Sequence, residues 1–124
     1  MINQPTPRHF VELPNEDLDE DGTFWRYESS ITNYENGHNK AHVYPREFTG
    51  MRETPKGLWV LSAHAIECGV NEKMHLIRHD HKKKFAYPTQ AEAFQAWKYR
   101  LRKREEHWNT EGRRINALKQ AIAE

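Results

Sequence analysis

The spacing of apolar residues changes once along the chain, near residue 88, and the change separates two kinds of pattern. Before it, short stretches alternate apolar and polar residues at every second position, the period of a half-buried β-strand. After it, apolar residues recur at steps of three and four, the period of one helix face. We therefore expect an α+β fold in which an antiparallel meander of four to five short strands is packed by one long C-terminal helix.

The first strand is predicted at residues 23–31, where Trp25 and Tyr27 alternate with Phe24 and Arg26. Asn-Gly at 36–37 supplies the residues that a tight hairpin turn needs, within what we expect to be a longer loop. A second strand follows, and its proline places it at an edge or a bulge because proline cannot donate to a ladder. The strands that we expect beyond the first cover residues 41–48, 58–61, 73–79 and 84–87, with a turn at 54–57.

The helix is predicted to begin at residue 90, because Thr89 and Glu92 form a capping box directly after a proline. An apolar seam of alternating three- and four-residue steps then continues to residue 122, with Arg104 and Glu111 filling two of its positions. Gly112 is expected to mark a kink or break. The apolar members of the seam are Phe94, Trp97, Leu101, Trp108, Ile115, Leu118 and Ile122.

The predicted helix is too long for the domain that carries it. Thirty-three residues span about 50 Å, whereas a compact domain of this size is roughly 35 Å across. Phe94, Trp97 and Leu101 are expected to cover the sheet, and the rest of the seam to bind a partner, either a second copy of the chain or another protein. The alternative is a break at 109–112 that lets a second helix fold back. The predicted partner-binding residues are Trp108, Ile115, Leu118 and Ile122.

The composition indicates a single domain with a small hydrophobic core. The chain has 124 residues, 36% hydrophobic, with a mean hydropathy of −1.04 and 14 aromatic side chains. We expect an extended acidic N-terminal arm at 1–22 and a single α+β domain at 23–124, with its sheet at 23–87 and its helix at 90–122. One cysteine, no apolar run long enough to span a bilayer and no signal-peptide pattern at the start favour the cytoplasm and no membrane contact.

Charge is strongly segregated along the sequence. Residues 1–28 carry seven acidic and two basic residues, and residues 78–104 carry nine basic and two acidic residues. The two blocks either neutralise each other in the fold or face different partners. The basic block makes nucleic-acid binding an alternative function, with phosphates following the hairpin tip and the early helix. Its predicted contacts are Lys82, Lys83, Lys84, Lys98, Arg100, Arg102, Lys103 and Arg104.

Residues 17–28 match the spacing of an EF-hand calcium loop. Asp17, Asp19, Asp21 and Glu28 occupy the carboxylate positions, and Gly22 occupies the sharp turn. The flanks differ from an EF-hand, because a strand and not a helix is predicted to carry Glu28. A calcium-stabilised structural protein is therefore a further hypothesis, and an acidic turn before a strand is its alternative.

No catalytic constellation is found in the sequence. His75, His79 and His81 share a strand face at zinc-ligand spacing, but the adjacent lysines disfavour a cation there. Cys68 has no assigned base beside it. Nucleophile-elbow, phosphate-loop and metalloprotease motifs are all missing from the sequence. We therefore expect no enzyme and no cofactor other than calcium.

Two stretches carry specific motifs: T-P-K-G-x-W-V at 54–60, and A-Y-P-T-x-x-E-A at 86–93 leading into a basic helix. Over about residues 48–105 the chain resembles a group of small proteins from tailed bacteriophages, in which a strand similar to 24–28 often stands upstream. The resemblance implies a phage or prophage accessory protein made in a bacterial cytoplasm. Its motifs are structural and transfer no catalytic residue. The chain departs from the group at 63–71 and 17–21.

Three functional hypotheses follow. The first is a non-enzymatic accessory protein that binds a host or phage protein, antagonising a host defence or regulatory complex, with the acidic stretch 16–21 imitating nucleic-acid charge. The second is a nucleic-acid-binding protein, and the third is a calcium-stabilised structural protein.

Overall fold

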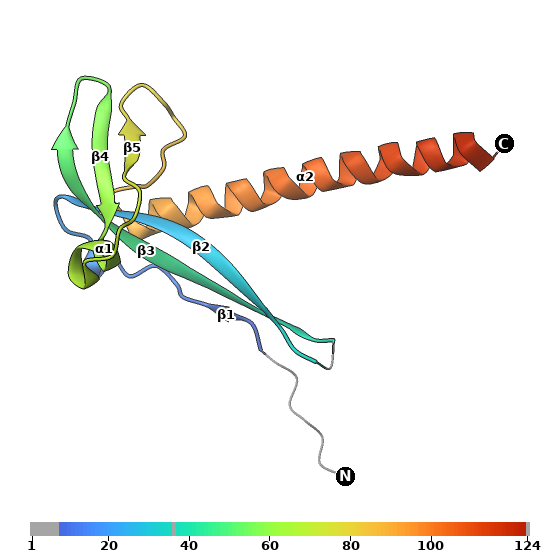
Figure 1. Cartoon of the computed structure of the whole chain (residues 1–124), viewed down its shortest axis with the longest axis horizontal. Coiled ribbons are helices and arrows are strands. Elements are labelled where there is room, and N and C mark those ends of the chain that lie inside the picture. Colours follow the sequence, from blue (N-terminus) through green and yellow to red (C-terminus); the bar gives the residue numbers. More distant parts are fainter. Residues whose placement is uncertain (1–7, 36, 124) are drawn as a thin grey trace, which may run out of the picture.

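The computed structural model describes residues 8–35 and 37–123 and shows an α+β fold with a five-stranded mixed sheet and one long C-terminal helix (Figure 1). The elements in chain order are β1 (Phe10–Val11), the 3₁₀ helix η1 (Glu16–Leu18), β2 (Thr23–Asn33), β3 (Asn39–Glu53), β4 (Gly57–Ser62), α1 (Ala63–Cys68), β5 (His75–Arg78) and α2 (Gln90–Ala123).

The predicted α+β class is confirmed, and the predicted antiparallel meander is confirmed in part: β2, β3, β4 and β5 pair antiparallel in chain order, but β1 adds to the sheet in parallel. β3 is the central strand, and β2 pairs antiparallel with it from Thr23 opposite Thr49 to Asn33 opposite Asn39. The other edge of β3 is shared: β4 pairs antiparallel with its C-terminal part, and β1 pairs parallel with His42 and Val43. β4 is short and does not extend along β3 as far as His42 and Val43. The two-residue strand β1, from the N-terminal segment, pairs with β3 there instead.

Pro45 lies in this central strand and not at the edge or bulge expected from the sequence. Trp25 exchanges both backbone hydrogen bonds with Tyr87, at 2.6 and 2.8 Å, so its N–H and C=O point away from β3. Tyr27 is turned the same way two residues later. Pro45, which pairs with Tyr27, therefore directs its nitrogen away from β2 and toward the other edge of β3. At that edge Pro45 lies between the stretch that pairs with β1 and the stretch that pairs with β4. A residue without an N–H loses no hydrogen bond at that position.

The predicted strand at 84–87 is also wrong, because this segment forms only one bridge, between Tyr87 and Trp25. It runs beside β2 without building a ladder. The stretch after β4, for which no element was predicted, forms α1, capped by the Ser62 hydroxyl that accepts the Ala65 N–H at 3.0 Å. The Thr-Pro-Lys-Gly turn joins β3 and β4 as expected, closed by two hydrogen bonds between Thr54 and Gly57.

The core consists of two clusters that follow the alternation along β2. Trp25, Tyr27, Val43 and Ala93 form the first, with Phe94 and Trp97 of α2 packed against it. The second cluster lies under the segment that follows β5 and contains Phe48, Val60, Ile77 and Ala86, with Phe24, Leu58 and Phe85 around it. α2 therefore covers one face of β2 and β3 with its first turns only.

The start of α2 is held by its capping box and by the N-terminal segment. The Thr89 hydroxyl accepts the Glu92 N–H at 3.2 Å and donates to the Glu92 carboxylate at 3.0 Å. Asp19 accepts the Gln90 N–H at 3.2 Å, and the buried Gln90 amide oxygen accepts the Asn15 N–H at 2.7 Å. Residues 1–7 of the predicted arm lie outside the described residues, whereas residues 10–19 contact the sheet and the helix.

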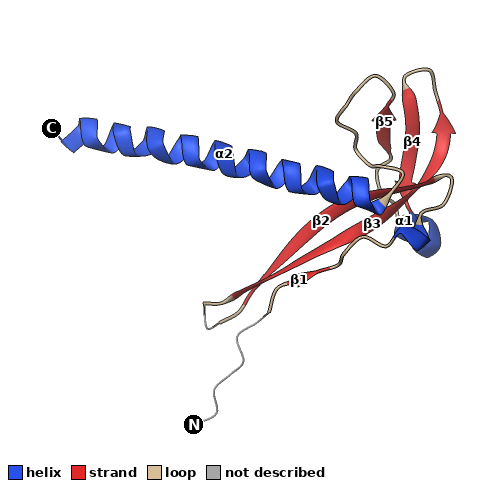
Figure 2. Ribbon diagram, turned by 180° about the vertical axis from the view of Figure 1, so that it is seen from behind, coloured by secondary structure: helices blue, strands red, loops and turns tan. Residues whose placement is uncertain are grey.

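α2 continues through Gly112 to Ala123, so the predicted alternative of a break at 109–112 is wrong. Beyond its first turns the helix leaves the sheet and extends into solvent, as Figures 1 and 2 both show. A Cβ at Gly112 would meet nothing within 4 Å, so no other part of the described chain packs against the helix at this point.

Candidate functional site

α2 has two halves with different surroundings. In the anchored half, residues 90–100, the Phe94 ring meets the edge of Tyr27 at 4.9 Å between centroids, and Trp97 packs beside it. Arg100 closes this half by donating from Nη2 to the Tyr27 carbonyl at 2.7 Å. In the projecting half, residues 101–123, no described residue is buried.

The apolar seam is exposed throughout the projecting half. Trp108 is 78% exposed and Ile122 84%, and Ile115 and Leu118 are about half exposed. Leu101, which the sequence places over the sheet, is 51% exposed, because the helix has already left the sheet at that point. The structure thus places the four predicted partner-binding residues on one unpartnered helix face.

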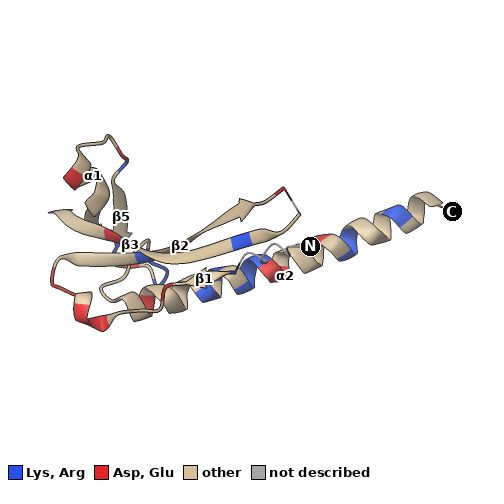
Figure 3. Ribbon diagram, turned by 90° about the horizontal axis from the view of Figure 1, so that it is seen from below, with Lys and Arg blue, Asp and Glu red and all other residues tan. Residues whose placement is uncertain are grey.

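Three of the predicted basic residues, one from the hairpin tip and two from the early helix, lie around the Tyr99 ring. The Lys83 ammonium, the Arg102 guanidinium and the Lys103 ammonium each lie 5.5 Å from the centre of this ring. Lys84 turns back to the Arg78 carbonyl at 2.9 Å, and Lys98 lies over the Phe94 ring. Figure 3 shows basic residues along α2 and acidic residues gathered around η1, near the helix start.

Three arginines line a hollow between β2 and α2, which we call the arginine hollow. It has a volume of about 400 Å³ and is lined by Arg26, Glu28, Ser29, Trp97, Arg100 and Arg104, together with Tyr27 and Leu101. A smaller hollow of about 180 Å³ shares Arg26 and Arg100 and is bordered by Lys83, Lys84 and Tyr99. Arg26 was not predicted as a site residue, although its position between Trp25 and Tyr27 already placed it on the face opposite to theirs.

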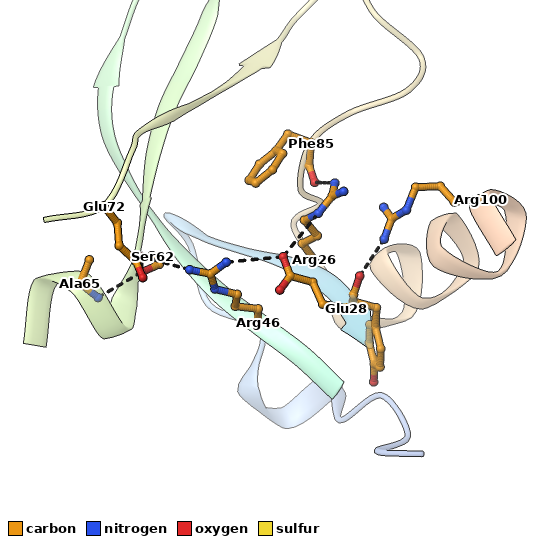
Figure 4. Close-up of polar contacts among 9 residues, drawn as sticks. Arg26, Glu28, Arg46, Ser62, Ala65, Glu72, Phe85 and Arg100 are labelled. Atoms are coloured by element: carbon orange, nitrogen blue, oxygen red, sulfur yellow. Dashed lines mark hydrogen bonds and ion pairs between the residues drawn. The ribbon is translucent and has the colours of Figure 1, made fainter. Parts of the chain in front are cut away.

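Arg26 and Arg46 are linked through Glu28 (Figure 4). The Glu28 carboxylate lies 3.7 Å from Arg26 Nε and 3.5 Å from Arg46 Nη1. Arg26 also donates from Nη1 to the Phe85 carbonyl at 2.8 Å and stacks on the Phe85 ring at 4.6 Å. One carboxylate is therefore divided between two guanidinium groups.

The same chain of polar contacts continues from Arg46 to α1. Arg46 Nη2 lies 3.0 Å from the Glu72 carboxylate, which also accepts the Ser62 hydroxyl (Figure 4). The Ser62 hydrogen bond is the main reason that the pKa of Glu72 is below its usual value, with Arg46 contributing. This half of the contacts is fully paired and holds α1 to the sheet.

Burial gives the two inner arginines an unfavourable environment. It lowers the pKa of Arg26, an effect that Glu28 partly opposes. Burial likewise lowers the pKa of Arg100, and the charge of Arg26 lowers it further. The two cations therefore repel each other in a half-buried site, which an anion would stabilise.

The four predicted calcium ligands are not gathered by the fold. Asp19 binds the backbone at the start of α2, where the helix dipole favours negative charge. Glu28 lies on β2 among arginines, while Asp17 and Asp21 belong to η1 and to the turn before β2. Among the described residues, no group of three or more histidine, cysteine, aspartate or glutamate side chains is placed to hold a metal ion.

The histidines and the cysteine also have structural neighbours. His75 stacks on Phe85 at 3.9 Å, and burial lowers its pKa. His79 pairs with Glu53 at 2.7 Å. No base was predicted beside Cys68, but His64 Nδ1 lies 3.6 Å from its sulfur, one turn earlier in α1. The four-residue spacing within a helix is the signal that could have revealed this contact.

Comparisons with protein-family models, curated proteins and solved structures find no match for this chain. Within the described residues, no helix combines the length and apolar character needed to cross a membrane.

Proposed function

We propose that the protein is a non-enzymatic phage or prophage accessory protein that acts by protein–protein binding through the projecting half of α2, antagonising a host defence or regulatory complex. The observation that carries this proposal is the exposed seam, which extends beyond the sheet that the described residues form. Apolar residues at alternating three- and four-residue steps pack in helix–helix pairs. An exposed row of this kind, which includes a tryptophan, marks an interaction surface.

The first binding partner that fits this seam is a second copy of the chain, with its helix antiparallel. A parallel pair in register would place Arg104 against Arg104 and Glu111 against Glu111, which is repulsive. In the antiparallel pair, Leu101 faces Leu118, while Trp108 faces Glu111 and Ile115 faces Arg104. Each polar seam residue then packs beside an apolar one, and Arg104 comes within about one helical turn of Glu111 in the second copy. A host or phage protein is the other occupant.

Sedimentation equilibrium over a range of concentrations tests this assignment. We expect the parent chain to dimerise, Trp108→Asp to be monomeric, and Asn109→Asp to dimerise like the parent, because Asn109 lies outside the seam. A parent chain that stays monomeric would exclude self-pairing. If, in addition, Trp108→Asp and Asn109→Asp captured the same proteins from a bacterial lysate as the parent, the projecting half would not be the binding surface.

Nucleic-acid binding is a second candidate, favoured by the convergence of Lys83, Arg102 and Lys103 on one exposed tyrosine. Cations around an aromatic ring are the combination that holds phosphates and stacks a base. A mobility shift with single-stranded and duplex probes at two salt concentrations tests it.

We expect a shift that weakens with salt and that is abolished by Lys82→Glu combined with Arg100→Glu. The matched control is Arg113→Glu with Lys119→Glu, which makes the same charge change on the projecting half. The absence of a shift at low salt, or an equal loss in both double variants, would contradict nucleic-acid binding at the basic block.

A further inference from the structure

The arginine hollow has an excess of positive charge that its own residues do not balance. Three guanidinium groups, from Arg26, Arg100 and Arg104, face one carboxylate, that of Glu28. Glu28 is divided between Arg26 and Arg46. Within the described part of the chain, no carboxylate pairs with Arg100 or Arg104. The hollow is therefore a cationic depression on a protein whose overall net charge is only +1.

The two inner arginines are fixed in position before any ligand arrives. Arg26 is held by the carbonyl and the ring of Phe85, and Arg100 is held by the Tyr27 carbonyl. Arg100 uses Nη2 for that bond, so its remaining guanidinium N–H groups are free for a ligand. Because binding does not have to order these side chains, a ligand loses little affinity to conformational entropy.

Arg26 and Arg100 line both hollows together, and the charge of Arg26 disfavours the charged form of Arg100, which supports an anion as the missing partner. Both groups are partly buried and lose part of their hydration; Arg26 shares the Glu28 carboxylate with Arg46, and Arg100 pairs with no carboxylate among the described residues. Charges close together in a partly desolvated site interact strongly. An anion between them would replace the repulsion with two charge-assisted hydrogen-bonded contacts.

We propose that the arginine hollow binds a phosphate group and that Tyr99, in the adjoining hollow, stacks the base attached to it. Guanidinium groups match phosphate oxygens in pairs, which favours phosphate over a single-point anion. The adjoining hollow shares Arg26 and Arg100 and adds Lys83 and Lys84 beside the Tyr99 ring. A phosphate bonded to a nucleoside would place its base toward that ring.

This inference deepens the second candidate function and rests on it only for the source of the phosphate. A phosphodiester in single-stranded nucleic acid and the phosphate of a free nucleotide share the chemistry that the hollow recognises. Two binding measurements separate the sources: fluorescence anisotropy with a labelled single-stranded oligonucleotide, and calorimetry with a nucleoside monophosphate. Binding of the monophosphate without binding of the oligonucleotide would support the phosphate site and contradict the nucleic-acid function.

Competition tests the chemistry itself. Inorganic phosphate should displace the bound ligand more effectively than chloride at the same ionic strength, because it fits between fixed guanidinium groups. Equal displacement by phosphate and chloride would mean that only diffuse charge attracts the ligand, and it would overturn the proposal.

Two variants locate the site. Arg104→Gln removes one exposed lining charge and should weaken binding about tenfold, lowering the salt slope for a single strand by about 0.7. Its control, Arg113→Gln, makes the same charge change outside the hollow and should leave both values unchanged. Arg100→Lys keeps the charge but loses the planar fork, so it should also weaken binding several-fold.

Circular dichroism of each variant confirms that it is folded, and sedimentation shows whether its association state has changed. Binding is compared at concentrations at which all the variants are monomeric, because Arg104 also belongs to the seam. Equal loss in Arg104→Gln and Arg113→Gln, or unchanged binding in a folded Arg100→Lys, would overturn the assignment.

Discussion

The two halves of α2 carry the same repeat but have opposite surroundings. In the anchored half, Ala93 is 1% exposed and Trp97 packs against the core, whereas Trp108, three turns later in the same seam, is 78% exposed. The difference comes from the sheet: α2 packs on β2 and, to a smaller extent, on β3, and it leaves them after Arg100. The repeat determines which side of a helix is apolar, and the reach of the sheet determines how much of that side is buried.

This comparison also separates stability from interaction. Residues of the anchored half and of the sheet below it hold the fold together, and their substitution should lower the free energy of unfolding. Residues of the projecting half contribute little to the isolated chain, and their substitution should act on association. Substitutions compared with matched controls test this separation.

The largest expected effect comes from Gly57→Ala. A Cβ at this position would lie 2.1 Å from the Ile77 carbonyl oxygen and 2.9 Å from the Arg78 Cα, so β4 and β5 could not keep their spacing. Because backbone atoms must move, we expect a loss of about 3 kcal/mol, measured by urea unfolding. An unchanged midpoint would mean that β5 does not approach β4 this closely.

The next effect is that of Phe94→Ala, which removes the ring that packs on Tyr27. Phe94 is only partly buried, so we expect a loss of about 2 kcal/mol rather than the larger loss typical of a fully buried phenylalanine. Leu118→Ala is the matched change in the projecting half and should alter the unfolding of the monomer by less than about 0.5 kcal/mol. Similar losses in the two variants would contradict the division of the helix.

Asp19→Ala should have a smaller effect, again confined to the anchored half. It removes the carboxylate that accepts the Gln90 N–H at the start of α2, which typically costs about 1 kcal/mol. Asp17→Ala is the control, because its carboxylate makes no contact with the helix start among the described residues. A loss as large in Asp17→Ala would indicate a general charge effect rather than capping.

The smallest change is expected for Gly112→Ala, and it has the opposite sign to Gly57→Ala. Nothing lies within 4 Å of the added Cβ, and alanine favours a helix over glycine by about 1 kcal/mol. Helicity measured by circular dichroism at 222 nm should therefore rise, with little change in the urea midpoint of the sheet. A fall in helicity would mean that the projecting half is not a continuous helix.

The parts of the fold predicted from sequence are those with a long, regular pattern. β2, the turn at 54–57 and the whole of α2 with its capping box were predicted, and so was the overhang, because helix length and domain size follow from residue number alone. β1 was not predicted, since two residues carry no period. The segment at 84–87 has the composition of a strand, but pairing partners decide whether a strand forms, and only Tyr87 finds one.

The same reasoning explains what sequence could say of the candidate sites. The exposed seam was predicted apart from Leu101, which was expected over the sheet, because all its members lie on one helix. The arginine hollow was not, because Arg26 and Arg100 belong to different elements and meet only through the packing of α2 on β2. The acidic spacing at 17–28 suggested a calcium loop, yet a strand separates Glu28 from the aspartates.

The contacts at the start of α2 also have a consequence for the order of folding. Asn15 and Asp19 reach Gln90 across separations of 75 and 71 residues, and Tyr27 donates its hydroxyl proton to the Glu12 carbonyl from the sheet below. Contacts so distant in sequence form slowly, because a long loop must close first. The β2–β3 hairpin and the projecting turns of α2 need no such closure. We therefore expect docking of the helix start onto the N-terminal segment to be a late step of folding, and it needs residue 90 to have been synthesised.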